Sequence, residues 1–227
     1  MKTASLFLRR RTVWVPTLLG WLVLLLAGAV AAIALVRSVY PFLAVNEPVG
    51  APILVVEGWL SQDELDRAIG VFRAGKYERV VTTGGPLHPW PGSANDSTYA
   101  HRAADYLTRH GLSTVPVTPV PSPITHQDRT YTSAQMVRAW ARRSNIALEK
   151  LDVLSRGPHA RRSRFLYEEA FGPGVRIGII AVRPEDYPVA GWWHTSTGAR
   201  DVAQQAAGFL WVKFFFNPLQ GPGREQD

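Results

Sequence analysis

Hydrophobic residues are unevenly distributed along the chain, and the longest uncharged stretch lies near the N-terminus, from Thr12 to Val36. An α-helix rises about 1.5 Å per residue, so residues 12–36 would form a helix of roughly 37 Å. This length is sufficient to cross the hydrocarbon core of a bilayer with some tilt. The pattern therefore predicts a transmembrane helix over residues 12–36, preceded by a short N-terminal segment, residues 1–11.

Beyond this stretch, short apolar runs alternate with segments in which apolar residues recur at helical spacing. The runs predict strands at residues 53–56, 79–82, 115–120, 151–154 and 175–182. Their residues do not alternate between polar and apolar, which is typical of a parallel sheet that is covered on both faces. We predict an α/β fold, a Rossmann-like three-layer domain with a mostly parallel sheet, over residues 51–216.

Proline and glycine punctuate the predicted domain and its flanks. They indicate a linker at residues 37–50 and a C-terminal tail at residues 217–227. Pro119 lies in the third predicted strand, which is therefore expected at an edge of the sheet, because proline cannot donate a backbone hydrogen bond. In the last predicted helix, which begins near Thr197, we expect Trp211 and Phe214 in the core, with the membrane interface as the alternative.

The charges around the predicted transmembrane helix are asymmetric. Lys2 and the arginines at positions 9–11 precede it, whereas only Arg37 follows it closely. The positive-inside rule thus predicts a single-pass signal-anchor protein of the cytoplasmic (inner) membrane, with a cytoplasmic N-terminus and an extracytoplasmic domain. The alternative is a cleaved secretory signal, with an apolar core at residues 18–26. We favour the anchor because the uncharged stretch exceeds the roughly 7–15 residues of a signal core.

Composition narrows the function classes further. The formal net charge is +7, from 25 basic and 18 acidic residues, and five of the basic residues precede Ser38, so the domain carries only about +2. Apart from three arginines at positions 161, 162 and 164, no basic cluster is present, which argues against nucleic acid as a partner. The absence of cysteine excludes disulfides, thiol catalysis and cysteine-ligated zinc. No metal-binding motif or nucleophile elbow occurs, so we predict no metal site and assign no cofactor.

Candidate site residues follow the predicted strands, where ligands of parallel α/β sheets bind. Glu57 and Gly58 follow the first strand, and Thr83, Gly84 and Gly85 follow the second. The glycine amides could cradle an anion, or the glycines could serve a tight turn that needs a positive φ. Glu57 is a candidate general base or metal ligand, with pairing to an arginine as the alternative.

A helix begins near His159, after the fourth predicted strand, and Arg162 lies in its first turn. Cations are unfavourable at the positive end of a helix unless they bind an anion such as phosphate, which the arginine fork suits. For Arg161 and Arg164, the alternative is pairing with surface carboxylates such as Glu168.

Asp128, Arg129 and Thr130 precede another predicted helix, which begins at about Thr130 and ends near Arg143. An aspartate or threonine at this position is an ordinary N-cap. A ligand-facing role is the alternative.

Four blocks, taken in order, resemble motifs of the SanA/ElyC/YdcF-like family of envelope proteins. They are ILVVEG (residues 53–58), VVTTGG (residues 80–85), DRTYTSA (residues 128–134) and LSRGPHARRS (residues 154–163). The resemblance implies a Rossmann-like fold, a role in cell-envelope integrity, and involvement with the undecaprenyl-phosphate carrier of peptidoglycan synthesis. A cytoplasmic relative is associated with S-adenosylmethionine.

Individual residues of these blocks match positions of the family motifs. Gly84 and Gly85 match a Ser-Gly-Gly motif, Thr130 matches the threonine of S-x-N-T-x-E-N, and His159 and Arg162 match a histidine followed three residues later by arginine. The sequence departs from the family at two places. Glu57-Gly58-Trp59 replaces a glycine-rich turn, and Ser133-Ala134 replaces Glu-Asn.

These observations predict a membrane-anchored protein of cell-envelope homeostasis that binds or acts on a phosphate-containing ligand, such as one linked to polyprenyl phosphate. Gly84, Gly85, Arg129 and Arg162 would hold the anion, and His159 and Glu57 would exchange protons. Expected partners are the membrane, this ligand and envelope-synthesis proteins. The alternatives are a non-catalytic envelope interaction protein and an enzyme that binds S-adenosylmethionine or a nucleotide.

Overall fold

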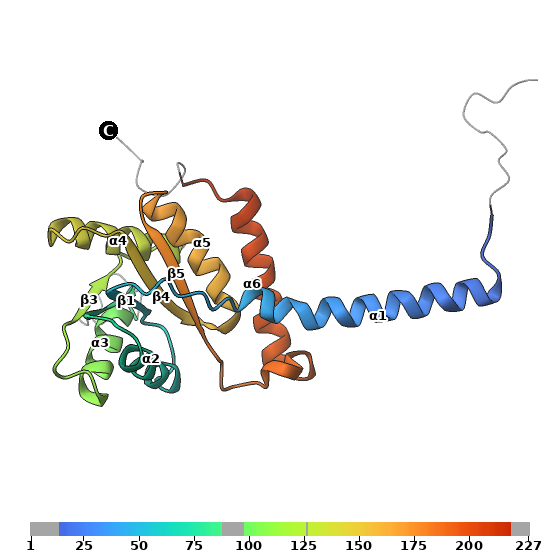
Figure 1. The fold of residues 1–227 in the computed structure, drawn as a ribbon, viewed down its shortest axis with the longest axis horizontal. Coiled ribbons are helices and arrows are strands. Elements are labelled where there is room, and N and C mark those ends of the chain that lie inside the picture. The colour runs from blue at the N-terminus through green and yellow to red at the C-terminus, as the bar shows by residue number, and fades with distance from the viewer. Residues whose placement is uncertain (1–13, 88–97, 126, 219–227) are drawn as a thin grey trace, which may run out of the picture. The chain divides into compact units, whose positions relative to one another are not determined.

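The structure is a computed structural model that describes residues 14–87, 98–125 and 127–218 (Figure 1). The chain divides into two compact units, Met1–Ser38 and Val39–Asp227. The predicted N-terminal segment, residues 1–11, lies outside the described residues, as does most of the predicted tail.

The first helix is α1 (Leu18–Leu43), and its most apolar 18-residue stretch has a mean hydropathy of 2.6 and is not buried. By length and composition it could cross a membrane. Its bounds differ from the predicted span of residues 12–36. Residues 14–17 precede it without helical structure, and the helix continues through Pro41 into the predicted linker.

α1 continues past Val36 because its last residues pack in the second unit. Tyr40 and Leu43 are buried in one hydrophobic cluster with Tyr187 and Val202. A proline removes a helical hydrogen bond, but burial of these side chains offsets that loss at position 41. The prediction of a linker is therefore wrong for residues 37–43.

The segment that follows α1 is fixed to the sheet. The backbone of Glu47 pairs with that of Ile179, and the amides of Val49 and Ala51 donate to the carboxylate of Asp152, at 2.7 and 3.0 Å. Asp152 is fully buried and also accepts a hydrogen bond from the Tyr77 hydroxyl, at 3.1 Å. The rest of the predicted linker is thus an ordered part of the domain.

The sheet has five strands in the order β3-β2-β1-β4-β5, and every pair is parallel. The predicted α/β fold is confirmed, and so is the edge position of the proline-containing strand. The strands are β1 (Ile53–Glu57), β2 (Arg79–Gly84), β3 (Val117–Pro121), β4 (Lys150–Arg156) and β5 (Arg176–Val182). The chain builds β1 to β3 toward one edge and then returns to β4, so the strand order switches between β1 and β4.

Helices cover both faces of the sheet, as predicted (Figure 1). Alternate residues of β1 point to opposite sides: Leu54 and Val56 pack with α2 and α3, whereas Ile53 and Val55 pack with α4, α5 and α6. The helices are α2 (Gln62–Ala74), α3 (Tyr99–His110), α4 (Arg129–Arg143), α5 (Ala160–Phe171) and α6 (Ser196–Phe215), with 3-10 turns at Gly157–His159 and Val189–His194.

The prediction that Trp211 and Phe214 belong to the core is wrong. Their exposed fractions are 51% and 73%. α6 turns Val202 and Val212 toward the domain, and both are buried. Because successive helical residues are about 100° apart, Phe214 faces away from the side on which Val212 lies, and Trp211 lies at the flank of the helix.

Candidate functional site

A cavity of about 510 Å³ lies at the carboxyl ends of β1 and β2, where Glu57 and Thr83 end up side by side in the strand register. Its walls come from the starts of α4 and α5 and from one side of α6. Nine of the ten residues predicted from the sequence line it: Glu57, Thr83, Gly84, Gly85, Asp128, Arg129, Thr130, His159 and Arg162.

The tenth predicted residue, Gly58, lies behind the cavity wall. Its N–H donates to the carbonyl of Thr83 at 2.7 Å. A Cβ at this position would collide with the backbone of Tyr99 and of Thr83. Gly58 therefore allows the turn after β1 to pack against the start of α3, and its role is structural.

Glu57 is the last residue of β1, and only 3% of it is exposed. Its Oε2 accepts a hydrogen bond from Oγ of Ser155 at 2.6 Å, and its Oε1 accepts one from Oγ of Ser163 at 2.8 Å. The basic atom within 4 Å, among the described residues, is Nε2 of His159, at 3.8 Å. Glu57 is thus oriented by two hydroxyls beside an imidazole, and the alternative of pairing with an arginine is not observed.

His159 is 5% exposed and ends the 3-10 turn before α5. Its Nδ1 lies 2.9 Å from Nη2 of Arg162 and 2.9 Å from Oε1 of Gln205. A guanidinium only donates and a carbonyl oxygen only accepts, so the two contacts require opposite protonation of Nδ1. While Arg162 donates to Nδ1, the ring proton is on Nε2, which faces Glu57 and lies 3.5 Å from Oγ1 of Thr130.

The charge state of His159 follows from its surroundings. Burial lowers its pKa; the nearby carboxylate of Glu57 opposes this shift and the charge of Arg162 reinforces it. Trp59 covers the imidazole edge-on, with ring centroids 5.2 Å apart. His159 is therefore a neutral imidazole at pH 7, the form that accepts a proton.

Arg162 points from the first turn of α5 into the cavity. Burial lowers its pKa, but an arginine remains charged in a protein. Its Nε is buried without a hydrogen-bond partner, and no carboxylate of the described residues lies within ion-pair distance. Gly208 on α6 makes room for it, because a Cβ there would collide with Nη1 of Arg162. Arg162 thus has unused capacity to donate toward an anion.

The start of α4 contributes a second group of polar residues. Asp128 occupies the N-cap position with a left-handed backbone (φ 51°), and its side chain makes no capping hydrogen bond. Its carboxylate lines the cavity instead, and burial raises its pKa. Arg129 also lines the cavity and, among the described residues, makes no ion pair. Since α4 and α5 both begin here, two positive helix ends face the same space.

The two glycines after β2 differ in their roles. Gly84 has a φ of 141°, and a Cβ there would lie 2.6 Å from that of Tyr99. The tight-turn interpretation therefore applies to Gly84. Gly85 has an ordinary φ, and a Cβ would meet only distant atoms, the nearest at 3.6 Å, so Gly85 lines the cavity without a steric requirement for glycine.

The other two arginines of α5 have structural partners. Arg164 pairs with Glu47 and with Glu168, the latter at 2.9 Å, as the surface-pairing alternative expected. Arg161 donates to the carbonyl of Phe42, and its guanidinium lies 4.0 Å from the Phe42 ring centroid. Arg162 is therefore the member of this cluster that serves the cavity.

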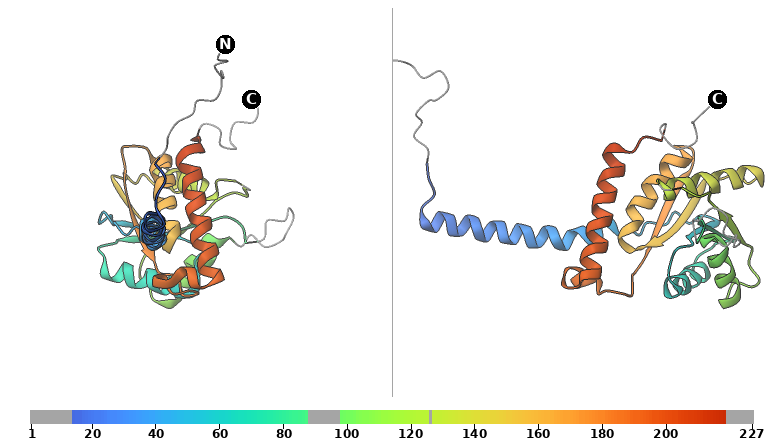
Figure 2. Two further views of the ribbon diagram at one scale, coloured as in Figure 1. Left: turned by 90° about the vertical axis from the view of Figure 1, so that its right-hand side faces the viewer. Right: turned by 180° about the vertical axis from the view of Figure 1, so that it is seen from behind.

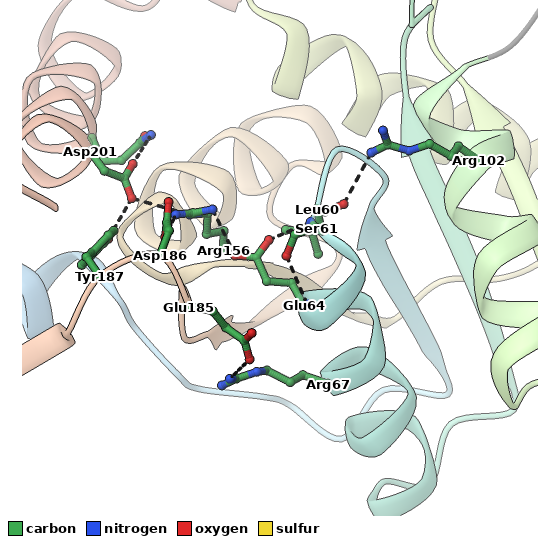
Figure 3. A network of polar contacts seen from close by, with 11 residues as sticks. Leu60, Ser61, Glu64, Arg67, Arg102, Arg156, Glu185, Asp186, Tyr187 and Asp201 are labelled. Atoms are coloured by element: carbon green, nitrogen blue, oxygen red, sulfur yellow. Dashed lines mark hydrogen bonds and ion pairs between the residues drawn. The ribbon is translucent and has the colours of Figure 1, made fainter. Parts of the chain in front are cut away.

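A polar network supports the site from behind (Figure 3). Arg156, at the end of β4, forms ion pairs with Glu64 at 3.3 Å, with Asp201 at 3.6 Å and with Asp186. Asp201 also accepts a hydrogen bond from the Tyr187 hydroxyl at 2.8 Å. Asp201 and Gln205 lie one turn apart on α6, with the Gln205 amide 3.5 Å from Oδ1. The network thus fixes the helix that carries the Gln205 contact to His159.

Sequence reasoning missed several residues of the site: Ser155, Ser163, Gln205, Gly208 and Trp211. The two serines fall inside the block of residues 154–163, so their position beside Glu57 could have been suspected. No local signal marks the three residues of α6. They reach the cavity because α6 packs against α5, far along the chain.

No cluster of three or more metal-binding side chains occurs among the residues described. The polar groups of the cavity include two arginines, an imidazole, two carboxylates and two helix N-termini, a set suited to an anion with exchangeable protons. Compared with family models, the sequence matches none, and no curated protein matches it significantly.

Proposed function

We propose that this protein binds a phosphate-bearing ligand of the cell envelope, and that the ligand is linked to a lipid of the polyprenyl-phosphate type. One observation carries the proposal. Arg129 and Arg162 lie at the N-termini of two helices and line the same cavity, and neither forms an ion pair with a carboxylate of the described residues. A phosphate can accept hydrogen bonds from both arginines and from the helix N-termini at once. Arginine binds phosphate through two parallel hydrogen bonds, and helix N-termini favour negative charge.

The apolar part of the cavity supports a lipid-linked ligand over a free anion. Trp59, Leu166, Trp211 and Val212 line it beside the arginines. Inorganic phosphate would leave this surface in contact with water, whereas an apolar group next to the phosphate would cover it.

Glu57 and His159 support a proton-transfer role for the same site. When the guanidinium of Arg162 turns to a phosphate, Nδ1 of His159 loses its donor and becomes free to accept a proton. The resulting imidazolium would keep Nε2–H toward Glu57, 3.8 Å away, and the carboxylate would stabilise the new charge. The same arrangement can return the proton in the reverse direction.

The proposed location follows from α1 and its flanking charges. Four basic residues before the apolar helix support a cytoplasmic N-terminus and a domain outside the inner membrane. Lipid-linked phosphates are present there, whereas S-adenosylmethionine is a cytoplasmic metabolite. A reporter fused to the C-terminus tests this topology, and a cytoplasmic reporter would contradict it.

Thermal unfolding of the full-length protein in lipid nanodiscs tests the binding proposal. A short-chain polyprenyl phosphate is compared with its alcohol, with inorganic phosphate and with S-adenosylmethionine. A ligand at 100 times its dissociation constant stabilises the folded state by about 2.7 kcal/mol, so a true ligand raises the midpoint. We expect the polyprenyl phosphate to do so and the alcohol not to.

Two matched variants on α5 make this test specific. Arg162→Gln should abolish the shift, whereas Arg164→Gln, two residues further along α5 and paired with Glu47 and Glu168, should keep it. If both variants respond like the wild type, the phosphate does not bind in this cavity. A shift with S-adenosylmethionine alone would replace the proposal by the cofactor alternative.

A further inference from the structure

The outward face of α6 is apolar over its C-terminal half. Of the described residues after Ser38, seven large hydrophobic side chains are exposed, and four of these lie on α6. They are Leu210, Trp211, Phe214 and Phe215, with exposed fractions of 53%, 51%, 73% and 73%. With the exposed Ala203 and Ala207, they recur at intervals of three and four residues, so they form one continuous stripe.

Packing against the domain core accounts only for the apolar residues on the opposite face of α6. Val202 and Val212 are buried, and Phe209 is packed against the core. α6 runs along α5 at the outside of the domain (Figure 2). A helix at such a position normally exposes polar side chains, and contiguous exposed apolar residues mark a surface that contacts something else.

The composition of the stripe fits the interfacial layer of a bilayer. Tryptophan is enriched at that depth, and leucine and phenylalanine enter the acyl boundary beneath it. Residues 202–216 contain no carboxylate, and their single charge is that of Lys213, which is exposed. The Nζ of Lys213 lies 5.0 Å from the ring centroid of Phe165. A lysine beside aromatic side chains can reach lipid phosphates, whereas a carboxylate would be repelled by them.

The stripe adjoins the end of α1. The ring of Phe42 contacts that of Phe209 edge-to-face, with centroids 5.7 Å apart, and Tyr40 and Leu43 share a cluster with Val202. Arg37, the first charged residue after the apolar stretch, is only three positions before Tyr40. A spanning helix leaves the hydrocarbon near its first charge, because charges are excluded from the core and long basic side chains extend to the interface.

We propose that the stripe formed by Leu210, Trp211, Phe214 and Phe215 lies in the interfacial layer of the bilayer that holds α1. The covalent anchor keeps this face at a high effective concentration near the lipid, so a weak contact is sufficient. Trp211 belongs both to the stripe and to the cavity wall. The contact therefore places the rim of the cavity at the lipid surface, whatever ligand the cavity binds.

The absence of cysteine allows a direct test by site-specific labelling of the full-length chain. Phe214→Cys and, as the control, Arg109→Cys carry an environment-sensitive fluorophore in vesicles of phosphatidylcholine and phosphatidylglycerol. Arg109 is on α3, and its side chain is 76% exposed. Lipids with a spin label at a shallow or a deep acyl position serve as quenchers.

We expect emission at position 214 to be blue-shifted and quenched at least threefold more than at position 109, most strongly by the shallow label. Phe215→Cys provides a second position, should the first variant fail to fold. Quenching equal to that of the control overturns the proposal. So does a blue shift without quenching that depends on the protein-to-lipid ratio, because it would show that a second copy covers the stripe.

Discussion

Arg162 donates a hydrogen bond to Nδ1 of His159, three residues before it, at 2.9 Å. The arginine thereby occupies the nitrogen that Gln205 otherwise contacts at the same distance. The cation of the cavity, Arg162, is therefore in direct contact with its base, His159. An anion that attracts the guanidinium would free the imidazole in the same movement, so ligand binding and proton acceptance are linked by one side chain.

The first prediction concerns Gly208. A methyl group there collides with the far end of the Arg162 side chain, which is flexible, so Gly208→Ala should displace Arg162 without unfolding the domain. We expect at least a fivefold weaker affinity for the phosphate ligand in the nanodisc assay. Gly70→Ala is the matched control, because no atom lies within 4 Å of its added Cβ. Equal affinities of both variants would show that Arg162 does not bind the ligand.

The second prediction concerns pH. Burial holds the pKa of His159 below the ordinary value of about 6.5. Between these two values the unfolded chain binds more protons than the folded chain. The free energy of unfolding should therefore decrease as the pH falls below about 6.5, by at most about 1.4 kcal/mol per pH unit.

Denaturant unfolding at several pH values, in detergent, measures this dependence. His159→Gln should make the slope between pH 5 and 7 shallower, whereas His110→Gln, at an exposed position on α3, should leave it unchanged. An unchanged slope in His159→Gln would mean that the imidazole has the same pKa in the folded and the unfolded chain.

The third prediction concerns Asp152. Asp152→Ala leaves the amides of Val49 and Ala51 and the hydroxyl of Tyr77 without their acceptor. A buried unsatisfied group costs about 1–3 kcal/mol, and one of these three groups is buried and two are half-buried, so we expect a loss of about 2–4 kcal/mol in the free energy of unfolding. Asp105→Ala, which breaks an exposed pair with Arg109, should cost less than about 1 kcal/mol. Similar losses in both variants would contradict the role of Asp152 as the clamp of residues 49–51.

The fourth prediction concerns Arg156. Arg156→Met leaves Glu64, whose side chain is 1% exposed, without its ion-pair partner. Removing one partner of a buried pair costs about 3–5 kcal/mol. The comparable exposed pair of Arg67 and Glu185 provides the control, since Arg67→Met should cost at most about 1 kcal/mol. Denaturant midpoints of the two variants should therefore differ clearly, and coinciding midpoints would argue against the network.

The strands, their parallel arrangement and the position of the cavity could be predicted from local patterns. Apolar runs without alternation identify a covered sheet, and Pro119 identifies its edge. Glu57, Gly84 and His159 could be placed in one site because the carboxyl ends of parallel strands share one edge of the sheet. Each of these inferences depends on residues within one short segment and not on contacts between distant segments.

The rest depends on contacts between distant segments. Gln205 and Gly208 reach the site through the packing of α6 against α5, and nothing near them in the sequence marks this contact. The helical state of Tyr40 and Leu43 results from their burial beside Tyr187, which overrides the signal of Pro41. The exposure of Phe214 likewise depends on which face of α6 the domain covers.

The direct passage from α1 to the clamped residues 49–51 limits how far the domain can travel. A chain that continues as a helix to Leu43 and is tied to the sheet from Glu47 onward has almost no slack. If α1 spans a membrane, as we propose, a domain on such a short tether cannot search the surrounding fluid in three dimensions. Its encounters would then occur within a thin layer along the lipid surface, and a ligand that diffuses laterally in the same membrane would meet it most often.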